Sequence, residues 1–344
     1  MKVLHLLASN KFSGAENVVC QIIDMFKGDN SVDMVYCSPD GPINQTLKDK
    51  QINFIPLTKL SKKETQKAIN TYNPDVIHAH DVKASIVASG FEKKIRVISH
   101  IHGNDERKMG KFTLKSAIYN WASKKFSKIF WVSKSCYDKY HFKNKVTNKS
   151  EVLYNIIDIN KLKEKSSSDS KSYEYEICCL GRLVEVKNPI RALNILKEVI
   201  NIRPQTKCAF IGDGDMRADC ENFVKNNHLS NNIYFLGFQS NPYKILQDSR
   251  LLLMSSINEG TPMALLEAFS LGIPLVSTKV DGAVELITDN RMGYLYDSNG
   301  EAVNQIISLL NSNKKDSAEY LTEFSKNYNN KDLYIKSILT AYKN

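Results

Sequence analysis

The chain has 344 residues, of which 42% are hydrophobic and 24% charged, and it carries a formal net charge of +10 at pH 7. This length suffices for two domains of ordinary size, and the composition is typical of a globular protein. No run approaches the roughly 18–20 apolar residues of a membrane-spanning helix. We expect a cytoplasmic protein whose first residues, MKVLHLLASN, form a strand and not a signal peptide.

The first half alternates apolar runs with amphipathic stretches, which predicts a parallel sheet with helices on both faces. Strands are expected at 3–8, 34–37, 53–57, 75–80, 96–100, 129–132 and 151–154. Helices are expected at 15–26, 43–50, 65–72, 82–91, 114–124 and 134–140. The first predicted domain comprises residues 1–165.

The second half repeats this alternation after residues 164–172, EKSSSDSKS, whose composition is typical of a linker or a surface loop. Strands are expected at 177–180, 207–211, 233–236, 251–254 and 275–277, and Asp281-Gly282 is expected to form a turn. Helices are expected at 189–201, 216–226, 241–248, 263–271, 301–311, 317–327 and 331–342. The second predicted domain comprises residues 173–344, and both domains are predicted to be doubly wound α/β folds.

The loop after strand 251–254 carries candidate binding residues, because doubly wound folds bind ligands at the carboxyl ends of their strands. Glu259 precedes a helix that begins near Thr261-Pro262 and carries Glu267. The first N–H groups of that helix suit a diphosphate, and Thr261 suits a cap. The two carboxylates suit the hydroxyls of a ribose and a sugar. Taken alone, both glutamates are also compatible with solvated surface positions.

Arg182 and Lys187 follow strand 177–180 and stand close to the start of the next helix. A planar guanidinium and a point charge in this place can clamp a diphosphate, although both residues also suit a plain surface. Residues 213–215, Asp-Gly-Asp, have the spacing of a metal-binding pair but lie in a predicted turn, and residues 212–214 lack the third glycine of a dinucleotide fingerprint. We therefore expect neither a metal nor a cofactor.

The pattern E-G-x-P-x-x-x-L-E followed by A-x-x-x-G-x-P-x-V resembles the retaining family 4 glycosyltransferases of GT-B fold, which include enzymes of bacterial surface-polysaccharide assembly. The matching residues are Glu259, Gly260, Pro262, Leu266, Glu267, Ala268, Gly272, Pro274 and Val276. The resemblance implies two Rossmann-like domains facing across a cleft, with an N-terminal acceptor domain and a C-terminal donor domain. It also implies that the last helix, 331–342, packs back on the first domain.

The resemblance further implies roles for individual residues. The expected catalytic residues are His102, Arg182, Lys187 and Glu259, with the two cations on the leaving diphosphate. The expected donor-binding residues are Gly14, Arg182, Lys187, Gly237, Phe238, Glu259, Gly260, Met263, Ala264, Leu265 and Glu267. The expected acceptor-binding residues are His80 and His102. Two positions depart from the family pattern, since Ser13 and Ile156 replace glycines.

Residues 107–150 hold twelve Lys and Arg side chains and a single acid, Asp138, so this segment carries more than the whole net charge of the chain. Interleaved with the cations are Phe112, Tyr119, Trp121, Phe126, Phe130, Trp131, Tyr137, Tyr140 and Phe142. This composition favours docking on an anionic membrane surface. Nucleic-acid binding and a merely solvated basic face are the alternatives.

The cysteines indicate a reducing environment. There are seven of them, an odd number without a C-x-x-C pair, and most lie in apolar surroundings: Cys20, Cys37, Cys136, Cys178, Cys179, Cys208 and Cys220. They are expected to be reduced core thiols without a metal site.

We therefore expect a retaining, metal-independent glycosyltransferase that moves a hexose from a UDP-sugar to a hydroxyl of a polyprenyl-diphosphate-linked glycan, in capsule, O-antigen or exopolysaccharide synthesis. It would act as a peripheral protein on the inner face of the plasma membrane and would bind no nucleic acid. The alternatives are a nucleotide-sugar epimerase or a phosphorylase of the same fold, and a basic nucleic-acid-binding protein.

Overall fold

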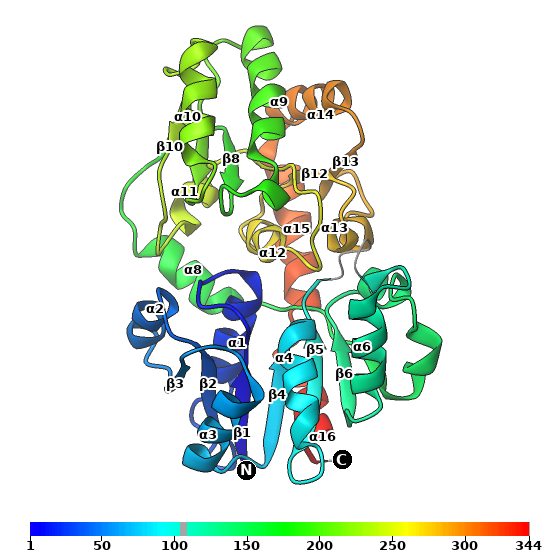
Figure 1. The fold of residues 1–344 in the computed structure, drawn as a ribbon. Helices are drawn as coiled ribbons and strands as arrows, with labels where there is room; N and C mark the ends of the chain where they lie inside the picture. Colours follow the sequence, from blue (N-terminus) through cyan, green and yellow to red (C-terminus); the bar gives the residue numbers. More distant parts are fainter. Residues whose placement is uncertain (104–108, 344) are drawn as a thin grey trace. The chain divides into compact units, whose positions relative to one another are not determined.

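The computed structural model describes residues 1–103 and 109–343, which form two compact units (Figure 1). Unit 1 consists of residues 1–155 and the C-terminal helix from Lys331 onward, and unit 2 consists of Ile156–Asn330. Each unit is built on a parallel sheet whose strands alternate with helices. The prediction of two doubly wound α/β folds is thereby confirmed.

Unit 1 has a seven-stranded sheet in the order β3-β2-β1-β4-β5-β6-β7. Its strands are β1 (Lys2–Leu6), β2 (Asp33–Pro39), β3 (Phe54–Leu57), β4 (Val76–His80), β5 (Arg96–Ile101), β6 (Lys128–Trp131) and β7 (Ser150–Val152). Its helices are α1 (Gly14–Met25), α2 (Ile43–Asp49), α3 (Lys62–Tyr72), α4 (Asp81–Ala88), α6 (Leu114–Ser123), α7 (Lys134–Asp138) and α16 (Lys331–Lys343), with 3₁₀ turns η1 (Ser89–Phe91), η2 (Lys143–Lys145) and η3 (Thr147–Lys149). The strand order reverses beside β1, so the carboxyl ends of β1 and β4 form the switch point where such folds bind ligands.

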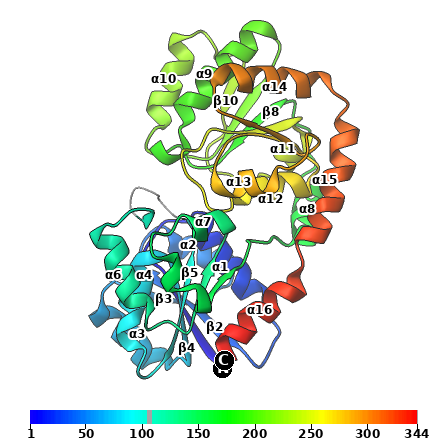
Figure 2. The same ribbon diagram turned by 90° about the vertical axis from the view of Figure 1, so that its right-hand side faces the viewer.

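Helices cover both faces of this sheet, with α4 and α6 on one side and α1 and α16 on the other (Figure 2). Because both faces are covered, the strands are continuous apolar runs, as in the buried residues Leu4, Ile77 and Ile98. The helices begin at capping residues: the Ser61 and Thr113 side chains accept backbone N–H groups at the starts of α3 and α6.

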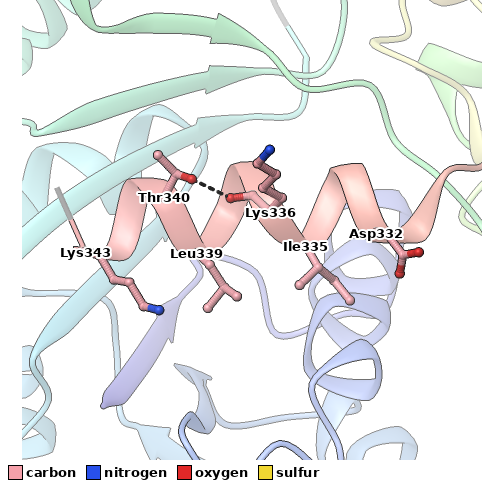
Figure 3. Close-up of a pocket in the computed structure, with 6 residues that line it drawn as sticks. All are labelled: Asp332, Ile335, Lys336, Leu339, Thr340 and Lys343. Atoms are coloured by element: carbon pink, nitrogen blue, oxygen red, sulfur yellow. Dashed lines mark hydrogen bonds between the residues drawn. The ribbon is translucent and has the colours of Figure 1, made fainter.

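The C-terminal helix α16 packs within unit 1. Its buried face includes Ile338 and Tyr342, and the Tyr342 hydroxyl lies 2.8 Å from Nδ1 of His78 on β4. A hollow elsewhere on the helix is lined by Asp332, Ile335, Lys336, Leu339, Thr340 and Lys343 (Figure 3). One helix alone builds this hollow, and none of the predicted site residues lines it.

Unit 2 has a six-stranded sheet in the order β10-β9-β8-β11-β12-β13. Its strands are β8 (Ile177–Leu180), β9 (Cys208–Ile211), β10 (Ile233–Phe235), β11 (Leu251–Met254), β12 (Leu275–Thr278) and β13 (Gly293–Tyr296). Its helices are α8 (Ile159–Ser167), α9 (Pro189–Ile202), α10 (Arg217–Asn226), α11 (Tyr243–Asp248), α12 (Met263–Ser270), α13 (Asp281–Leu286), α14 (Asn299–Asn311) and α15 (Lys314–Tyr328), with the 3₁₀ turn η4 (Glu185–Lys187). The switch point of this sheet lies between β8 and β11, whose following loops carry the predicted cations and Glu259.

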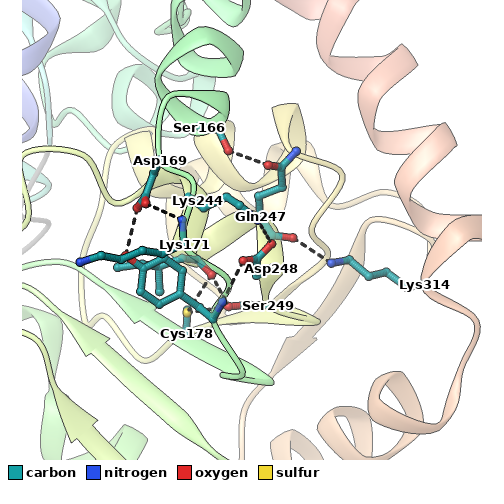
Figure 4. A network of polar contacts seen from close by, with 11 residues as sticks. Ser166, Asp169, Lys171, Cys178, Lys244, Gln247, Asp248, Ser249 and Lys314 are labelled. Carbon is teal, nitrogen blue, oxygen red and sulfur yellow. Dashed lines mark hydrogen bonds and ion pairs between the residues drawn. The ribbon is translucent and has the colours of Figure 1, made fainter.

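Of the two predictions for residues 164–172, a linker or a surface loop, the structure agrees with a surface segment: they comprise the end of α8 and a mostly exposed stretch within unit 2. Helix α8 packs on α11 of unit 2, where Ser166 Oγ donates to Gln247 Oε1 (2.6 Å) and Lys314 Nζ of α15 donates to the Gln247 carbonyl oxygen (2.8 Å) (Figure 4). The buried Leu162 anchors the helix. The boundary between the units therefore falls at residues 155 and 156, ahead of the predicted boundary at 165–173, because one apolar residue and a polar network suffice to dock this polar helix.

Residues 281–282, predicted to be a turn, begin the helix α13. The Gly282 N–H donates to the carbonyl oxygen of Gly260 (2.6 Å), and a Cβ at position 282 would overlap that oxygen. The glycine thus permits close packing of α13 against the loop that carries Glu259. Strand β13 (Gly293–Tyr296) was not predicted either.

Candidate donor-binding site

The loop after β11 is held against the turn after β8 by hydrogen bonds to backbone carbonyl oxygens. Ser255 Oγ donates to the carbonyl oxygen of Asn188 (2.8 Å), and the Ile257 N–H donates to the carbonyl oxygen of Val186 (2.8 Å). Because the two strands are neighbours in the sheet, these bonds fix the two loops at one edge. The predicted diphosphate-binding and sugar-binding residues are thereby brought together.

Lys187 and Glu259 form an ion pair across these two loops. Their side chains are 29% and 14% exposed, and the Glu259 carboxylate also accepts a hydrogen bond from Ser256 Oγ (2.7 Å). Lys187 is placed by the turn η4, which ends at Asn188 in the left-handed region (φ 48°) before Pro189 opens α9. The carboxylate and the cation therefore hold each other at the carboxyl edge of the sheet. Ser256 is a contact that the sequence analysis did not single out.

Arg182 lies beside this pair on an exposed segment, and its guanidinium has no partner among the described residues. The backbone around Arg182 packs against the predicted turn at residues 212–214. A Cβ on Gly212 would overlap the Gly181 carbonyl oxygen, and the Leu183 N–H donates to the Asp213 carbonyl oxygen (3.0 Å). The glycines there serve close packing under the cationic loop. A cavity at this edge is lined by Gly181, Arg182, Lys187 and Ser256, among other residues.

The N-terminus of α12 faces the same edge and has no side-chain cap. Pro262 is the N-cap residue, so Thr261 does not fill the predicted capping role. The Leu265 N–H already donates to the Pro262 carbonyl oxygen (3.2 Å), which leaves the N–H groups of Met263 and Ala264 as the anion donors of this helix end. Of the three backbone N–H groups predicted to bind the diphosphate, those of Met263, Ala264 and Leu265, only the first two thus remain available.

Glu267 lies one turn further along α12 and is 8% exposed. Its Oε1 accepts a hydrogen bond from the hydroxyl of Tyr243 on α11 (3.4 Å). Burial and the neighbouring Glu267 carboxylate raise the pKa of the Tyr243 hydroxyl above its ordinary value, so Tyr243 stays a donor. The sequence analysis did not single out Tyr243, which thus contacts the Glu267 carboxylate.

The remaining predicted donor residues occupy loops and helix ends. Gly237 has φ 66° and pairs with Gly212 beside the cationic loop, and Phe238 is 67% exposed. In unit 1, Gly14 is the first residue of α1, and a Cβ there would meet no atom within 4 Å. The preceding Ser13 donates from Oγ to Glu16, so the serine that replaces a glycine is used inside the protein.

Five of the seven histidines of the chain gather in unit 1 toward the carboxyl ends of β1, β4 and β5: His5, His78, His80, His100 and His102. Residues two apart on a strand stack, with ring centroids 4.4 Å apart in the pair His78–His80 and again in His100–His102. Burial lowers the pKa of His5 and of His102 to about 3 and lowers the pKa of the other three well below the ordinary value. All five rings are therefore neutral at pH 7.

His80 is unsuited to the acceptor-binding role expected of it. It is 1% exposed, and both of its ring nitrogens are used inside the protein, by His5 (3.0 Å) and by His102 (2.8 Å). The His102 side chain is partly buried, and its Nδ1 is a buried atom that has no hydrogen-bond partner among the described residues. Of the two predicted acceptor residues, only His102 has a free ring nitrogen.

The histidines form two sets of three whose ring nitrogens lie within 4.8 Å of one another, one of which is His80, His100 and His102. In this set, however, His80 Nδ1 and His102 Nε2 face each other at 2.8 Å, so one lone pair is already used by the N–H group of the other ring. A tetrahedral ion needs ligands that converge on one point. Within the set His80 and His102 are therefore hydrogen-bonded to each other, while His100 stacks on His102 and has no hydrogen-bond partner for its ring nitrogens among the described residues.

The basic segment 107–150 differs from its prediction in two ways. Its first two cations, Arg107 and Lys108, lie outside the described residues. Five of its nine aromatic residues are buried in the core of unit 1: Tyr119, Phe126, Phe130, Trp131 and Tyr140. Several cations are also neutralised or tied down inside the unit, as Lys128 by Glu151 (2.6 Å) and Lys149 by the Phe126 carbonyl oxygen (2.9 Å).

The exposed large hydrophobic side chains of this segment lie on α6 and two residues before it. These four side chains are named here the α6 stripe. They are Phe112, Leu114, Ile118 and Trp121, with exposed fractions of 72%, 78%, 39% and 56%. The last three recur at i, i+4 and i+7 and so lie on one face of the helix. Exposed Lys111 and Lys124 flank the stripe, and Lys125 lies over the Trp121 ring at 4.5 Å. Within the part of the chain that the structure describes, no helix is long and apolar enough to cross a membrane.

Two family models match the sequence of this chain, and solved structures resemble its fold. Residues 12–161 match the family model described as Glycosyltransferase Family 4, and residues 160–328 match Glycosyl transferases group 1. The chain has the GT-B fold: it is similar to the crystal structure of Anabaena Alr3699/HepE in complex with UDP-glucose, with a TM-score of 0.81 at 19% identity over 99% of this chain and 98% of that one. These findings place it among the glycosyltransferases of GT-B fold.

Two sequence relatives are informative. The uncharacterized glycosyltransferase MJ1059 of Methanocaldococcus jannaschii is 28% identical over 62% of this chain, and the chain spans only 57% of that relative's length. The UDP-Gal:alpha-D-GlcNAc-diphosphoundecaprenol alpha-1,3-galactosyltransferase of Escherichia coli is 24% identical over 87% of this chain and 84% of its own length. Both are described as glycosyltransferases, which is the class the two family models indicate.

Proposed function

We propose that the chain transfers a sugar from a nucleotide-diphosphate sugar to an acceptor hydroxyl. One observation supports this proposal most strongly. At the carboxyl edge of the sheet in unit 2 lie Arg182, Lys187, Glu259 and the start of α12, which has no side-chain cap. Cations and free N–H groups suit a diphosphate, while a fixed carboxylate suits sugar hydroxyls. Glu267, one turn further on, suits the ribose.

In the proposed reaction the bond between the sugar C1 and the phosphate oxygen breaks, and a bond from C1 to the acceptor oxygen forms on the same face. The acceptor proton passes to the leaving phosphate. Lys187 would exchange its pairing with Glu259 for the diphosphate, which frees the Glu259 carboxylate to accept hydrogen bonds from the sugar. Arg182, Lys187 and the α12 N–H groups would stabilise the charge on the leaving group without a metal. Asp213 of the Asp-Gly-Asp turn pairs with Arg217 (3.2 Å) instead.

A UDP-sugar is the donor we propose, supported by the UDP-glucose complex of the similar structure and by the UDP-galactose in the printed name of the E. coli relative. That relative's name also supports a sugar linked to a polyprenyl diphosphate as the acceptor, hence a role in capsule, O-antigen or exopolysaccharide synthesis. Retention of the anomeric configuration rests on the resemblance of residues 259–276 to the retaining family 4 enzymes.

A panel of UDP-glucose, UDP-galactose, UDP-N-acetylglucosamine and GDP-mannose, assayed by thermal shift, tests the donor. A ligand present at about 100 times its Kd adds roughly 2.7 kcal/mol to the free energy of unfolding, which raises Tm by roughly 5–10 °C. Glu267→Ala is expected to lose most of this rise, because the ribose then loses its acceptor. Glu198→Ala, an exposed change on α9, is the matched control. If no nucleotide sugar raises Tm, the proposed activity is contradicted.

We further propose that the protein docks on the inner face of the plasma membrane through the α6 stripe and its flanking lysines. Apolar side chains on one helix face would enter the boundary between headgroups and acyl chains, while the lysines meet anionic headgroups. This orientation would bring the chain beside a lipid-linked acceptor. The proposal is narrower than the predicted basic segment, because most of its aromatic residues are core residues.

Sedimentation with vesicles tests this docking. The wild-type protein is expected to bind phosphatidylglycerol vesicles at low salt, to release them at high salt because the lysine contribution is screened, and to ignore phosphatidylcholine. The double variant Leu114→Ser/Trp121→Ser is expected to bind the vesicles at least tenfold more weakly. The reason is the loss of apolar contact area, which contributes on the order of 25 cal/mol of binding free energy per Å². Leu333→Ser, which changes a 60% exposed leucine on α16, should leave binding intact. Equal binding by both variants would rule out the α6 stripe.

A further inference from the structure

A chain of hydrogen-bond contacts runs through unit 1 from Met34 on β2 to His102 at the end of β5. His5 Nε2 lies 3.4 Å from the Met34 sulfur, and His5 Nδ1 lies 3.0 Å from His80 Nε2. His80 Nδ1 in turn lies 2.8 Å from His102 Nε2. His102 Nδ1 is the end of the chain and has no partner among the described residues.

Because each neutral imidazole carries one N–H and one lone pair, the three rings can adopt only two consistent arrangements. All three protons are on Nε2, or all three are on Nδ1, since a mixed arrangement sets two lone pairs or two N–H groups face to face at about 3 Å. The thioether of Met34 can accept but not donate a hydrogen bond. It therefore favours a proton on His5 Nε2, which selects the first arrangement for the whole chain.

We propose that Met34, His5 and His80 hold His102 in the tautomer with its proton on Nε2, so that the Nδ1 lone pair accepts a hydrogen bond from a hydroxyl of the bound sugar. The contact with the sugar rests on the proposed function, whereas the tautomer does not. His5 and His80 are then positioning residues, and His102 selects a sugar group that can donate a hydrogen bond at this place. An acceptor-only group, such as a fluorine or a methoxy oxygen, would be rejected there.

The backbone of His102 is held independently of its ring. The His102 N–H donates to Oδ1 of Asp81 (3.0 Å), the residue that follows His80. Asp81 adopts a positive φ of 63°, which is uncommon for a residue with a side chain and turns the chain at the end of β4. One strand end thus supplies both contacts of His102: Asp81 binds its backbone and His80 binds its ring.

Nitrogen NMR of protein labelled with ¹⁵N-histidine reads the tautomer directly, because protonated and unprotonated ring nitrogens have widely separated shifts. In the wild type, without any nucleotide sugar, His102 is expected to show a protonated Nε2 and an unprotonated Nδ1. Signals are assigned from their loss in single histidine variants. A wild-type His102 with its proton on Nδ1 would overturn the proposal.

Variants of the chain sharpen this test. His80→Phe removes the acceptor of His102 Nε2–H and is expected to give a mixture of His102 tautomers. His80→Asn places an amide oxygen near the position of Nδ1 and should restore the wild-type pattern. His100→Phe is the matched control, since His100 is as buried and stacks on His102, but neither of its ring nitrogens has a partner among the described residues. A His102 pattern that is unchanged in His80→Phe would contradict the relay.

The nearly volume-conserving change Met34→Leu keeps every histidine and replaces the thioether with a hydrocarbon that accepts no hydrogen bond. It is expected to shift part of the His102 population to the Nδ1–H form. If the thermal-shift panel finds a donor, Met34→Leu and His80→Phe should lower kcat by about tenfold, the effect of one hydrogen bond, and His80→Asn should recover most of it. A variant that loses the Nε2–H tautomer of His102 but keeps full activity would refute the contact with the sugar. If no nucleotide sugar binds the wild type, the proposed function is contradicted, whereas the NMR result on the tautomer is unaffected.

Discussion

Lys187→Ala is expected to lower kcat of sugar transfer by about 10²–10³, the typical loss for one group that stabilises developing charge in a transition state. The ammonium group is fixed by the turn η4 and by Glu259, so little reorganisation is needed when the diphosphate takes over the cation. Because the charge on the leaving phosphate develops during bond cleavage, kcat should fall more than KM rises. Transfer is measured as release of UDP in the presence of the donor found by thermal shift.

Three further measurements identify the cause of that loss. Lys197→Ala is the matched control: Lys197 lies on α9, the helix that follows Lys187, and donates only to Asn227 (2.8 Å) among the described residues. Lys187→Arg keeps the charge and is expected to retain part of the activity. Unfolding by urea shows whether Glu259, left without its partner, costs stability as well. Full activity of Lys187→Ala would contradict the proposed clamp, and inhibition by EDTA would contradict metal independence.

Acid is expected to unfold unit 1 between about pH 6.5 and pH 5, well above the range in which most carboxylates titrate. Burial keeps five imidazoles neutral in the folded chain, whereas each of them binds a proton below about pH 6.5 once the chain is unfolded. Because the folded-state pKa values are lowered, the contribution is fully present above pH 6.5 and is lost as the pH falls. The largest slope is about 1.4 kcal/mol per pH unit for each histidine.

For five histidines the free energy of unfolding should fall by about 7 kcal/mol between pH 7.5 and pH 5.5, which is comparable to the whole stability of a typical domain. Urea unfolding followed by circular dichroism at steps of half a pH unit measures this slope. His100→Phe removes one of the five groups and should lower the slope by about one proton. A free energy that stays constant from pH 7 to pH 5.5 would show that these rings are protonated in the folded state.

The sequence predicted the layers of both units because strands buried on both faces leave continuous apolar runs and helices leave a 3.6-residue period. It also located the loop of Glu259 and the helix of Glu267, since both follow a strand within a stretch of 17 residues from Leu251 to Glu267. Elements with weak periodicity were missed. Helix α8 contributes little more than Leu162 to the core, and α13 spans only six residues.

Only the tertiary structure determined the contacts between residues that lie far apart in the sequence. His5, His80 and His102 belong to β1, β4 and β5, and they meet because these strands are neighbours in the parallel sheet. The aromatic residues of segment 107–150 show the same limit, because composition does not tell which of these side chains face the core. The sequence by itself therefore determined the fold and the chemical groups of the candidate donor site, whose residues are close in the chain or follow adjacent strands. Only the folded chain determined the direction of the hydrogen bonds at His102, because that direction depends on a methionine sulfur 68 residues away in the sequence.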